Sequence, residues 1–119
     1  MNKQLNFFED LSSTEQDNHA QLVHQYLELT NVVMPRLAKR QENNWPVKHN
    51  HCFARIVLDN VCQDLWYAHI KAPAYLHLST EQAEAAVRIC KEIIEGKADI
   101  HALNTRSLAY RAKASAPRQ

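Results

Sequence analysis

Glycine is almost missing from this chain of 119 residues, in which Gly96 is the single example. Glycine permits turns with positive φ and lets the backbone approach phosphate groups closely. A Rossmann loop, a P-loop or another glycine-rich anion cradle is therefore excluded. The scarcity also argues against a β fold rich in hairpins, because the turns of such folds use glycine.

Long apolar runs are missing as well. No stretch approaches the ~20 apolar residues that span a membrane, and Glu9 and Asp10 come too early for a secretory leader. The three cysteines, Cys52, Cys62 and Cys90, are an odd set without CxxC spacing. Because each sits in an apolar helical pattern, we expect buried, reduced thiols. These features predict a soluble cytoplasmic protein without a membrane partner.

A strong overall charge is also lacking, since the formal net charge is +1. The distribution is uneven: residues 1–30 carry one lysine against five acidic residues, a net of −4, whereas residues 97–119 have a net of +4. Two interpretations remain open. The two solvated ends attract each other, or the C-terminal segment is a basic binding face.

What the chain does contain is apolar residues at helical spacing. Hydrophobic residues make up 45% of the sequence, which suffices for one packed core at this length. We expect an all-α fold, a single-domain bundle of four to five helices over residues 1–113. Residues 114–119 should form a flexible C-terminal tail.

The residue pattern of the first half of the chain predicts helices. A short helix is expected over residues 5–11, and Ser12 or Ser13 should cap the longer helix that follows. Pro35 lacks a backbone N–H, so a kink or break is expected beside it. The polar residues 39–46 form the first convincing connection.

The second half predicts three further helices. A broad apolar arc over residues 51–71 suggests a central helix buried on more than one side. Ser79 and Gln82 form a capping box for the next helix, and Gly96 stands where a helix-ending glycine belongs. Asp99 should cap the last helix.

Polar chemistry gathers on the central helix. His51, Arg55 and Asp59 are spaced i, i+4 and i+8, so they share one stripe. A carboxylate, a guanidinium and an imidazole in line predict a site for an anionic or amide-bearing ligand, or a histidine tuned as a proton carrier. The alternative is an ordinary charged stripe in which Arg55 pairs with Asp59.

A second polar set recurs near the C-terminus. Asn104, Ser107 and Arg111 are spaced i, i+3 and i+7, with Arg106, Tyr110 and Lys113 beside them. Arginines interleaved with an aromatic ring can hold phosphates while the ring stacks on a base. The alternative is a terminal helix whose arginines dock on acidic side chains.

Metal binding and cysteine catalysis are not expected. His49, His51 and Cys52 lack a second pair of ligands at zinc-site spacing, so no metal is predicted. Cys52 and His51 point about 100° apart on a helix, which makes them a poor catalytic pair. The aromatic group is expected in the core, and comprises Trp45, Trp66, Tyr67 and Tyr75.

Several of these motifs carry a resemblance. They are His51-Cys52-Phe53-x-Arg55, Leu58-Asp59-Asn60, Pro73-Ala74-Tyr75 and Leu103-Asn104-x-x-Ser107. Over residues 49–113 the chain resembles a family of short microbial helical proteins identified as GNAT-type N-acetyltransferases. That enzyme class has a mixed α/β sheet and a glycine-containing loop for the coenzyme A pyrophosphate, whereas this chain has one glycine. The resemblance therefore transfers no catalytic or coenzyme-binding residue, and implies only that the two polar motifs share a surface.

Three functional hypotheses follow from the residues. The first is a binding or regulatory module whose groove holds a protein or a nucleotide-bearing, anionic partner, through His51, Arg55, Asp59, Asn104, Ser107 and Arg111. The second is a small transferase or hydrolase with His51 as base, oriented by Asp59, and with Arg55 as an electrophilic clamp. The third is nucleic-acid binding through the basic C-terminus. No cofactor is expected, and a homo-oligomer is compatible with the sequence.

Overall fold

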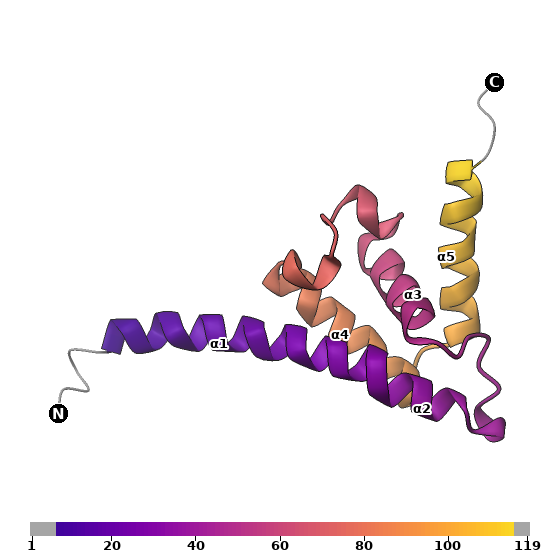
Figure 1. The fold of residues 1–119 in the computed structure, drawn as a ribbon, viewed down its shortest axis with the longest axis horizontal. Helices are drawn as coiled ribbons and strands as arrows, with labels where there is room; N and C mark the ends of the chain where they lie inside the picture. Colours follow the sequence, from indigo (N-terminus) through magenta and orange to yellow (C-terminus); the bar gives the residue numbers. More distant parts are fainter. Residues whose placement is uncertain (1–6, 116–119) are drawn as a thin grey trace.

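The computed structural model describes residues 7–115, with side-chain environments from Thr14 onward. Within this range the regular structure is helical throughout and includes no strand. The fold is all-α, as the sequence predicts. Figure 1 shows the five α-helices of this range, of which α5 stands across the direction of the long N-terminal helix α1.

The N-terminal arm is one helical run rather than two capped helices. It comprises α1 (Phe7–Glu28), a π-helical turn η1 (Leu29–Val33) and α2 (Met34–Ala38). The predicted start at Ser12 or Ser13 is wrong, because α1 passes through both positions without interruption. Residues 5 and 6 of the predicted short helix lie outside the described residues.

Pro35 widens this arm instead of breaking it. The N–H of Met34 donates to the carbonyl of Leu29, five residues back, which is the π-helical pattern. The Thr30 hydroxyl donates to the carbonyl of Tyr26 at 2.9 Å. The helical run therefore continues through the proline by way of a wider turn just before it.

Helix α3 (Asn50–Cys62) is shorter than predicted. The prediction that this helix reaches about residue 71 is wrong, since Gln63 adopts the left-handed conformation with φ 54° and ends the helix. The N–H of Asp64 donates to the carbonyl of Asp59, completing a Schellman-type end. Two single-turn 3₁₀ helices follow, η3 (Trp66–Ala68) and η4 (Ala74–Leu76).

The last two helices begin where the sequence predicts. Ser79 and Gln82 form the expected capping box of α4 (Thr80–Ile94), and Gly96 has φ 76° just beyond its end. A carboxylate oxygen of Asp99 accepts the N–H of His101 at 2.9 Å, which caps α5 (Ile100–Ser115). Ala114 and Ser115 of the predicted tail belong to α5, and residues 116–119 lie outside the described residues.

The core surrounds α3, which contacts α5 on one side and η1 and α4 on others. Ile56, Val57 and Leu58 of α3 are buried in succession, and the buried run continues into Asp59. The main buried apolar side chains are Tyr26, Met34, Phe53, Ile56, Val57, Leu58, Ala83, Ala86, Val87, Cys90 and Ile93. Within residues 7–115 no helix has the length and apolar character to cross a membrane.

Candidate functional site

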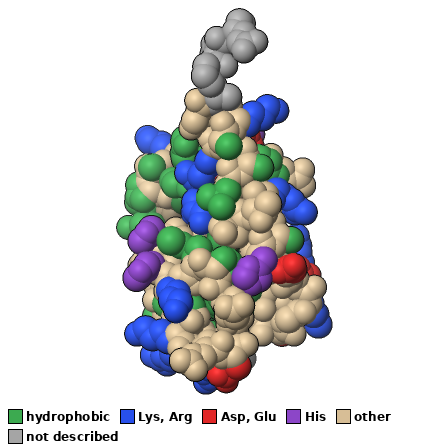
Figure 2. Space-filling model, turned by 90° about the vertical axis from the view of Figure 1, so that its right-hand side faces the viewer, with side chains coloured by type: hydrophobic (Ala, Val, Ile, Leu, Met, Phe, Trp, Pro, Cys, Tyr) green, Lys and Arg blue, Asp and Glu red, His purple; other side chains and the backbone are tan. Residues whose placement is uncertain are grey.

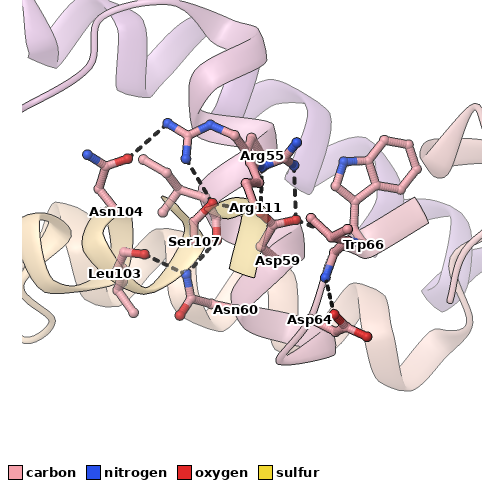
Figure 3. A network of polar contacts seen from close by, with 11 residues as sticks. Arg55, Asp59, Asn60, Asp64, Trp66, Leu103, Asn104, Ser107 and Arg111 are labelled. Carbon is pink, nitrogen blue, oxygen red and sulfur yellow. Dashed lines mark hydrogen bonds and ion pairs between the residues drawn. The ribbon is translucent and has the colours of Figure 1, made fainter. Parts of the chain in front are cut away.

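A carboxylate without solvent exposure lies at the centre of the contact between α3 and α5. Asp59 is 0% exposed and accepts hydrogen bonds from three directions (Figure 3). The Ser107 hydroxyl donates at 2.6 Å, and the Trp66 backbone N–H donates at 3.1 Å. Arg111 donates through Nε and Nη2 to the two carboxylate oxygens at 3.1 and 3.2 Å. This fork geometry gives a charge-assisted, orientation-specific pair.

Arg55 extends the network along the surface of α5. Its Nη1 donates to the Ser107 hydroxyl at 2.8 Å and its Nη2 to the Asn104 side-chain oxygen at 2.9 Å. Ser107, which is 0% exposed, therefore accepts from Arg55 while it donates to Asp59. The hydroxyl proton of Ser107 therefore points toward Asp59, and the hydrogen bonds run in one direction, from Arg55 through Ser107 to Asp59.

The end of α3 brings an exposed aromatic ring to this network. The turn after Gln63 carries Trp66 back to Asp59 and leaves Tyr67 55% exposed. The guanidinium carbon of Arg111 lies 5.6 Å from the centre of the Tyr67 ring. A cation at this distance from an aromatic face is stabilised by about 0.5–1 kcal/mol at an exposed site.

Asn60 forms further hydrogen bonds between α3 and α5. Its side-chain N–H₂ donates to the carbonyls of Ile56 at 2.7 Å and Leu103 at 3.0 Å, and its oxygen accepts from Arg106 at 3.3 Å. Among the described residues no buried side-chain nitrogen or oxygen lacks a partner. The polar contact between α3 and α5 is thus satisfied internally.

Five of the six predicted site residues come together here, namely Arg55, Asp59, Asn104, Ser107 and Arg111. The predicted pairing of Arg55 with Asp59 is replaced, because Arg111 forms the ion pair and Arg55 bonds to α5.

His51 lies apart from this group. It is exposed, and its ring stacks on that of His49 with centroids 5.8 Å apart. No described contact joins His51 to Asp59, which is saturated by other donors, so Asp59 does not orient His51 as a base. The acid–base pair of the transferase hypothesis is therefore not assembled in the described residues.

The cysteines and histidines form no further reactive cluster in the described part of the chain. All three thiols are free; the expectation of burial is confirmed for Cys90 and is wrong for Cys52 and Cys62, which are half-buried. No group of three or more His, Cys, Asp or Glu residues between 14 and 115 could hold a metal ion. Burial raises the pKa of Cys62, and the carboxylates of Asp59 and Asp64 raise it further.

The loop after α3 has one perturbed acid. A hydrogen bond from His69 at 3.0 Å and another from the N–H of Leu65 hold the pKa of Asp64 below its usual range. The ionised carboxylate therefore helps to fix the turn that positions Trp66 and Tyr67.

The predicted site residues leave out three participants, which are Asn60, Trp66 and Tyr67, whereas Arg106 was already placed beside the C-terminal polar set. The interpretation of the aromatic group as core is wrong for Tyr67 and Tyr75, which are 55% and 45% exposed, while Trp45 and Trp66 are half-buried. The available signal was the position of Trp66 and Tyr67 seven and eight residues beyond Asp59. Spacing alone does not show the contact that forms, because only the turn at Gln63 brings the backbone N–H of Trp66 to the Asp59 carboxylate.

Comparison with known proteins identifies no relative. No family model matches the chain, and no curated protein or solved structure matches it either. The resemblance to acetyltransferase-associated helical proteins is neither supported nor contradicted by these comparisons.

Proposed function

We propose that the protein is a binding module that recognises an acidic segment of a partner protein through a surface on α3, η3 and α5. The surface, which we call the Arg55–Arg111 face, consists of Arg55, Tyr67, Asn104, Leu108 and Arg111. The observation that carries the proposal is the fixed position of two partly exposed guanidinium groups, held from behind by Ser107 and Asp59.

Preorganised cations favour binding because little side-chain freedom is lost when a partner arrives. Free arginine side chains lose rotamer entropy of about 2 kcal/mol on immobilisation. Here the bonds of Arg55 to Asn104 and of Arg111 to Asp59 have already fixed both groups. The side chain of Arg111 remains 30% exposed, so a partner can reach part of it.

Apolar groups beside the arginines favour a protein partner. Leu108 is 50% exposed and Tyr67 is 55% exposed. Asn104, Leu108 and Arg111 are spaced i, i+4 and i+7, so they share one stripe of α5. Figure 2 shows apolar side chains beside Lys and Arg on the face of the molecule that carries α5. A partner segment with carboxylates next to an apolar side chain fits this mixture.

The number of cations argues against nucleic acid as the main partner. Helix α5 carries three cationic side chains, Arg106, Arg111 and Lys113, and no acidic residue. Non-specific DNA binding depends on the counterions that cationic side chains release, typically through roughly 6–10 phosphate contacts. The described part of α5 offers fewer cations than that.

The test compares two substitutions on the same helix. Leu108→Asp puts a negative charge on the Arg55–Arg111 face, whereas Ala109→Asp puts the same charge on an exposed position that is neither three nor four residues from Asn104, Leu108 or Arg111. Tagged wild-type protein and both variants are used for affinity capture, and the bound proteins are identified by mass spectrometry. We expect Leu108→Asp to lose a partner that Ala109→Asp retains, with unchanged circular dichroism and melting in both.

Two outcomes would contradict the proposal. Equal recovery of every partner by both variants would remove the Arg55–Arg111 face as the binding surface. Nuclease-sensitive material in place of protein would transfer the function to nucleic-acid binding.

A further inference from the structure

A second basic site lies at the opposite end of α3, in the connection between α2 and α3. Here a hollow of about 190 Å³ is lined by Lys39, Arg40 and Lys48, together with Asn44 and Trp45. Figure 2 shows Lys and Arg side chains gathered at the lower end of this face, where the connection lies in Figure 1. The hollow shares no lining residue with the Arg55–Arg111 face.

Among residues 14–115, whose side chains the structure describes, the three cations have no acidic partner. The ion pairs of this part of the chain involve Asp59, Asp64 and Glu95, none of which lines the hollow. Glu42 lies in the same connection and, among the described residues, forms no ion pair with them. Three like charges around one small space repel one another, and a bound anion would relieve that repulsion.

The connection that forms the hollow is held by two hydrogen bonds and one ring contact, to α2, α5 and α3. The Asn43 side chain donates to the carbonyl of Leu37 at 2.7 Å, and a ring nitrogen of His101 on α5 lies 3.0 Å from the carbonyl of Asn44. The Trp45 ring packs edge-on against Phe53 of α3, with centroids 5.7 Å apart. The cations are therefore carried on a fixed backbone, which lowers the entropic cost of binding a ligand.

The size and charge of the hollow define the ligand. Pockets for whole drug-sized ligands have volumes of about 300–1,000 Å³, so this hollow is suited to one small group. A phosphate monoester carries about −1.5 to −2 charges at pH 7 and three acceptor oxygens. Lysine and arginine are the usual side-chain donors to such a group.

We propose that the hollow bounded by Lys39, Arg40 and Lys48 binds the phosphate group of a small molecule, with Trp45 beside the carbon part of that molecule. This site is independent of the proposed partner-binding face. Inorganic phosphate and a phosphate monoester share the recognised chemistry, and the two are separated by comparing their affinities.

The test follows the fluorescence of Trp45. The chain has two tryptophans, so Trp66→Phe leaves Trp45 as the single reporter. This protein is titrated at constant ionic strength with inorganic phosphate, glycerol 1-phosphate and chloride. We expect saturable binding of the two phosphates and none of chloride. A monoester that binds more tightly than inorganic phosphate identifies a phosphorylated small molecule as the ligand, and equal or weaker binding of the monoester overturns that part of the proposal in favour of phosphate itself.

Substitutions then assign the site. Arg40→Gln and Lys48→Gln should each weaken phosphate binding at least tenfold, because each removes one of three cations. Lys71→Gln is the matched control, since Lys71 is exposed and lies outside the hollow. Equal affinities in the control and in both site variants would overturn the proposal, as would equal responses to chloride and phosphate. Because all three residues are exposed, folding is checked by circular dichroism alone.

Discussion

Asp59 is a charged residue without exposed surface, and two of its partners lie more than forty positions away in the sequence. Ser107, Arg111 and the Trp66 N–H each donate to it. Replacing a buried carboxylate by an amide leaves these donors facing an N–H₂ group, and removal of one member of a buried pair typically costs about 3–5 kcal/mol. Because Arg111 is partly exposed, we expect Asp59→Asn to cost about 3 kcal/mol.

Urea unfolding followed by circular dichroism measures this loss, and the melting temperature should fall by on the order of 10 °C. Asp17→Asn is the matched control, because Asp17 is exposed on α1 and makes the same change of charge. A loss equal to that of the control would mean that the buried network contributes nothing to the docking of α5.

Helical spacing predicted which residues share a stripe but not which residue each one contacts. Arg55 and Asp59 are four residues apart, which permits a pair, yet each is bonded to α5 instead. The choice depends on where Ser107 and Arg111 lie in space. Similarly, His51 belongs to the same stripe as Arg55, but its position at the start of α3 puts it beside His49 rather than in the network.

At the scale of a helix, the capping box of α4 gives the sharpest prediction. Ser79 accepts the N–H of Gln82 at 3.0 Å, and the Gln82 side chain accepts the N–H of Ser79 at 2.9 Å. Ser79→Ala removes the first of these bonds and should reduce stability by about 1 kcal/mol, whereas Ser79→Gly should cost only a few tenths.

Chemical unfolding of the two variants, with Thr105→Ala on the exposed face of α5 as reference, measures this difference. Alanine favours a helix interior over threonine, so Thr105→Ala should be neutral or slightly stabilising. Equal stability of Ser79→Ala and wild type would show that the box is not needed to begin α4.

The helix boundaries that the sequence predicted are those set by local chemistry. Ser79, Gly96 and Asp99 act within one turn of the chain, so their residue types suffice. The end of α3 was not predictable in this way, because Gln63 is not a typical left-handed residue. It is stabilised there by Asp59, which accepts from the Trp66 N–H, and by Asp64, which accepts from the Leu65 N–H.

For the whole molecule, two buried acids predict the response of stability to alkaline pH. Burial raises the pKa of Cys90 to about 12 from 9.0, and burial raises the pKa of Tyr26 above its ordinary 10.0. Between pH 9 and about pH 12, Cys90 loses its proton in the unfolded chain but keeps it in the folded chain. The free energy of unfolding therefore falls as the pH rises through this range, and Tyr26 acts in the same direction. From pH 9 to pH 10 the loss from Cys90 is about 1 kcal/mol, and Tyr26 adds a smaller one.

Urea unfolding at pH 8, 9 and 10 measures the slope. Cys90→Ala should reduce the dependence, and Tyr26→Phe should reduce it further at the upper end, even though each lowers stability at pH 8. A slope that neither substitution changes would assign the alkaline loss to other groups.

The all-α class followed from the shortage of glycine and the helical spacing of apolar residues. The packing of the helices against one another could not be predicted from the sequence. The broad apolar arc of α3 indicates that this helix has several neighbours, but it does not identify them. In the structure these neighbours are η1, α4 and α5.

The Asp59 network also determines how the sequence can vary. Arg55, Asp59, Asn104, Ser107 and Arg111 satisfy one another, so a change at one of these positions alters which residues the others tolerate. Single substitutions at these five positions are therefore expected to be destabilising. In sequences that descend from this one, we expect substitutions at the five positions to occur together. His51 has no part in these bonds and is free to vary alone.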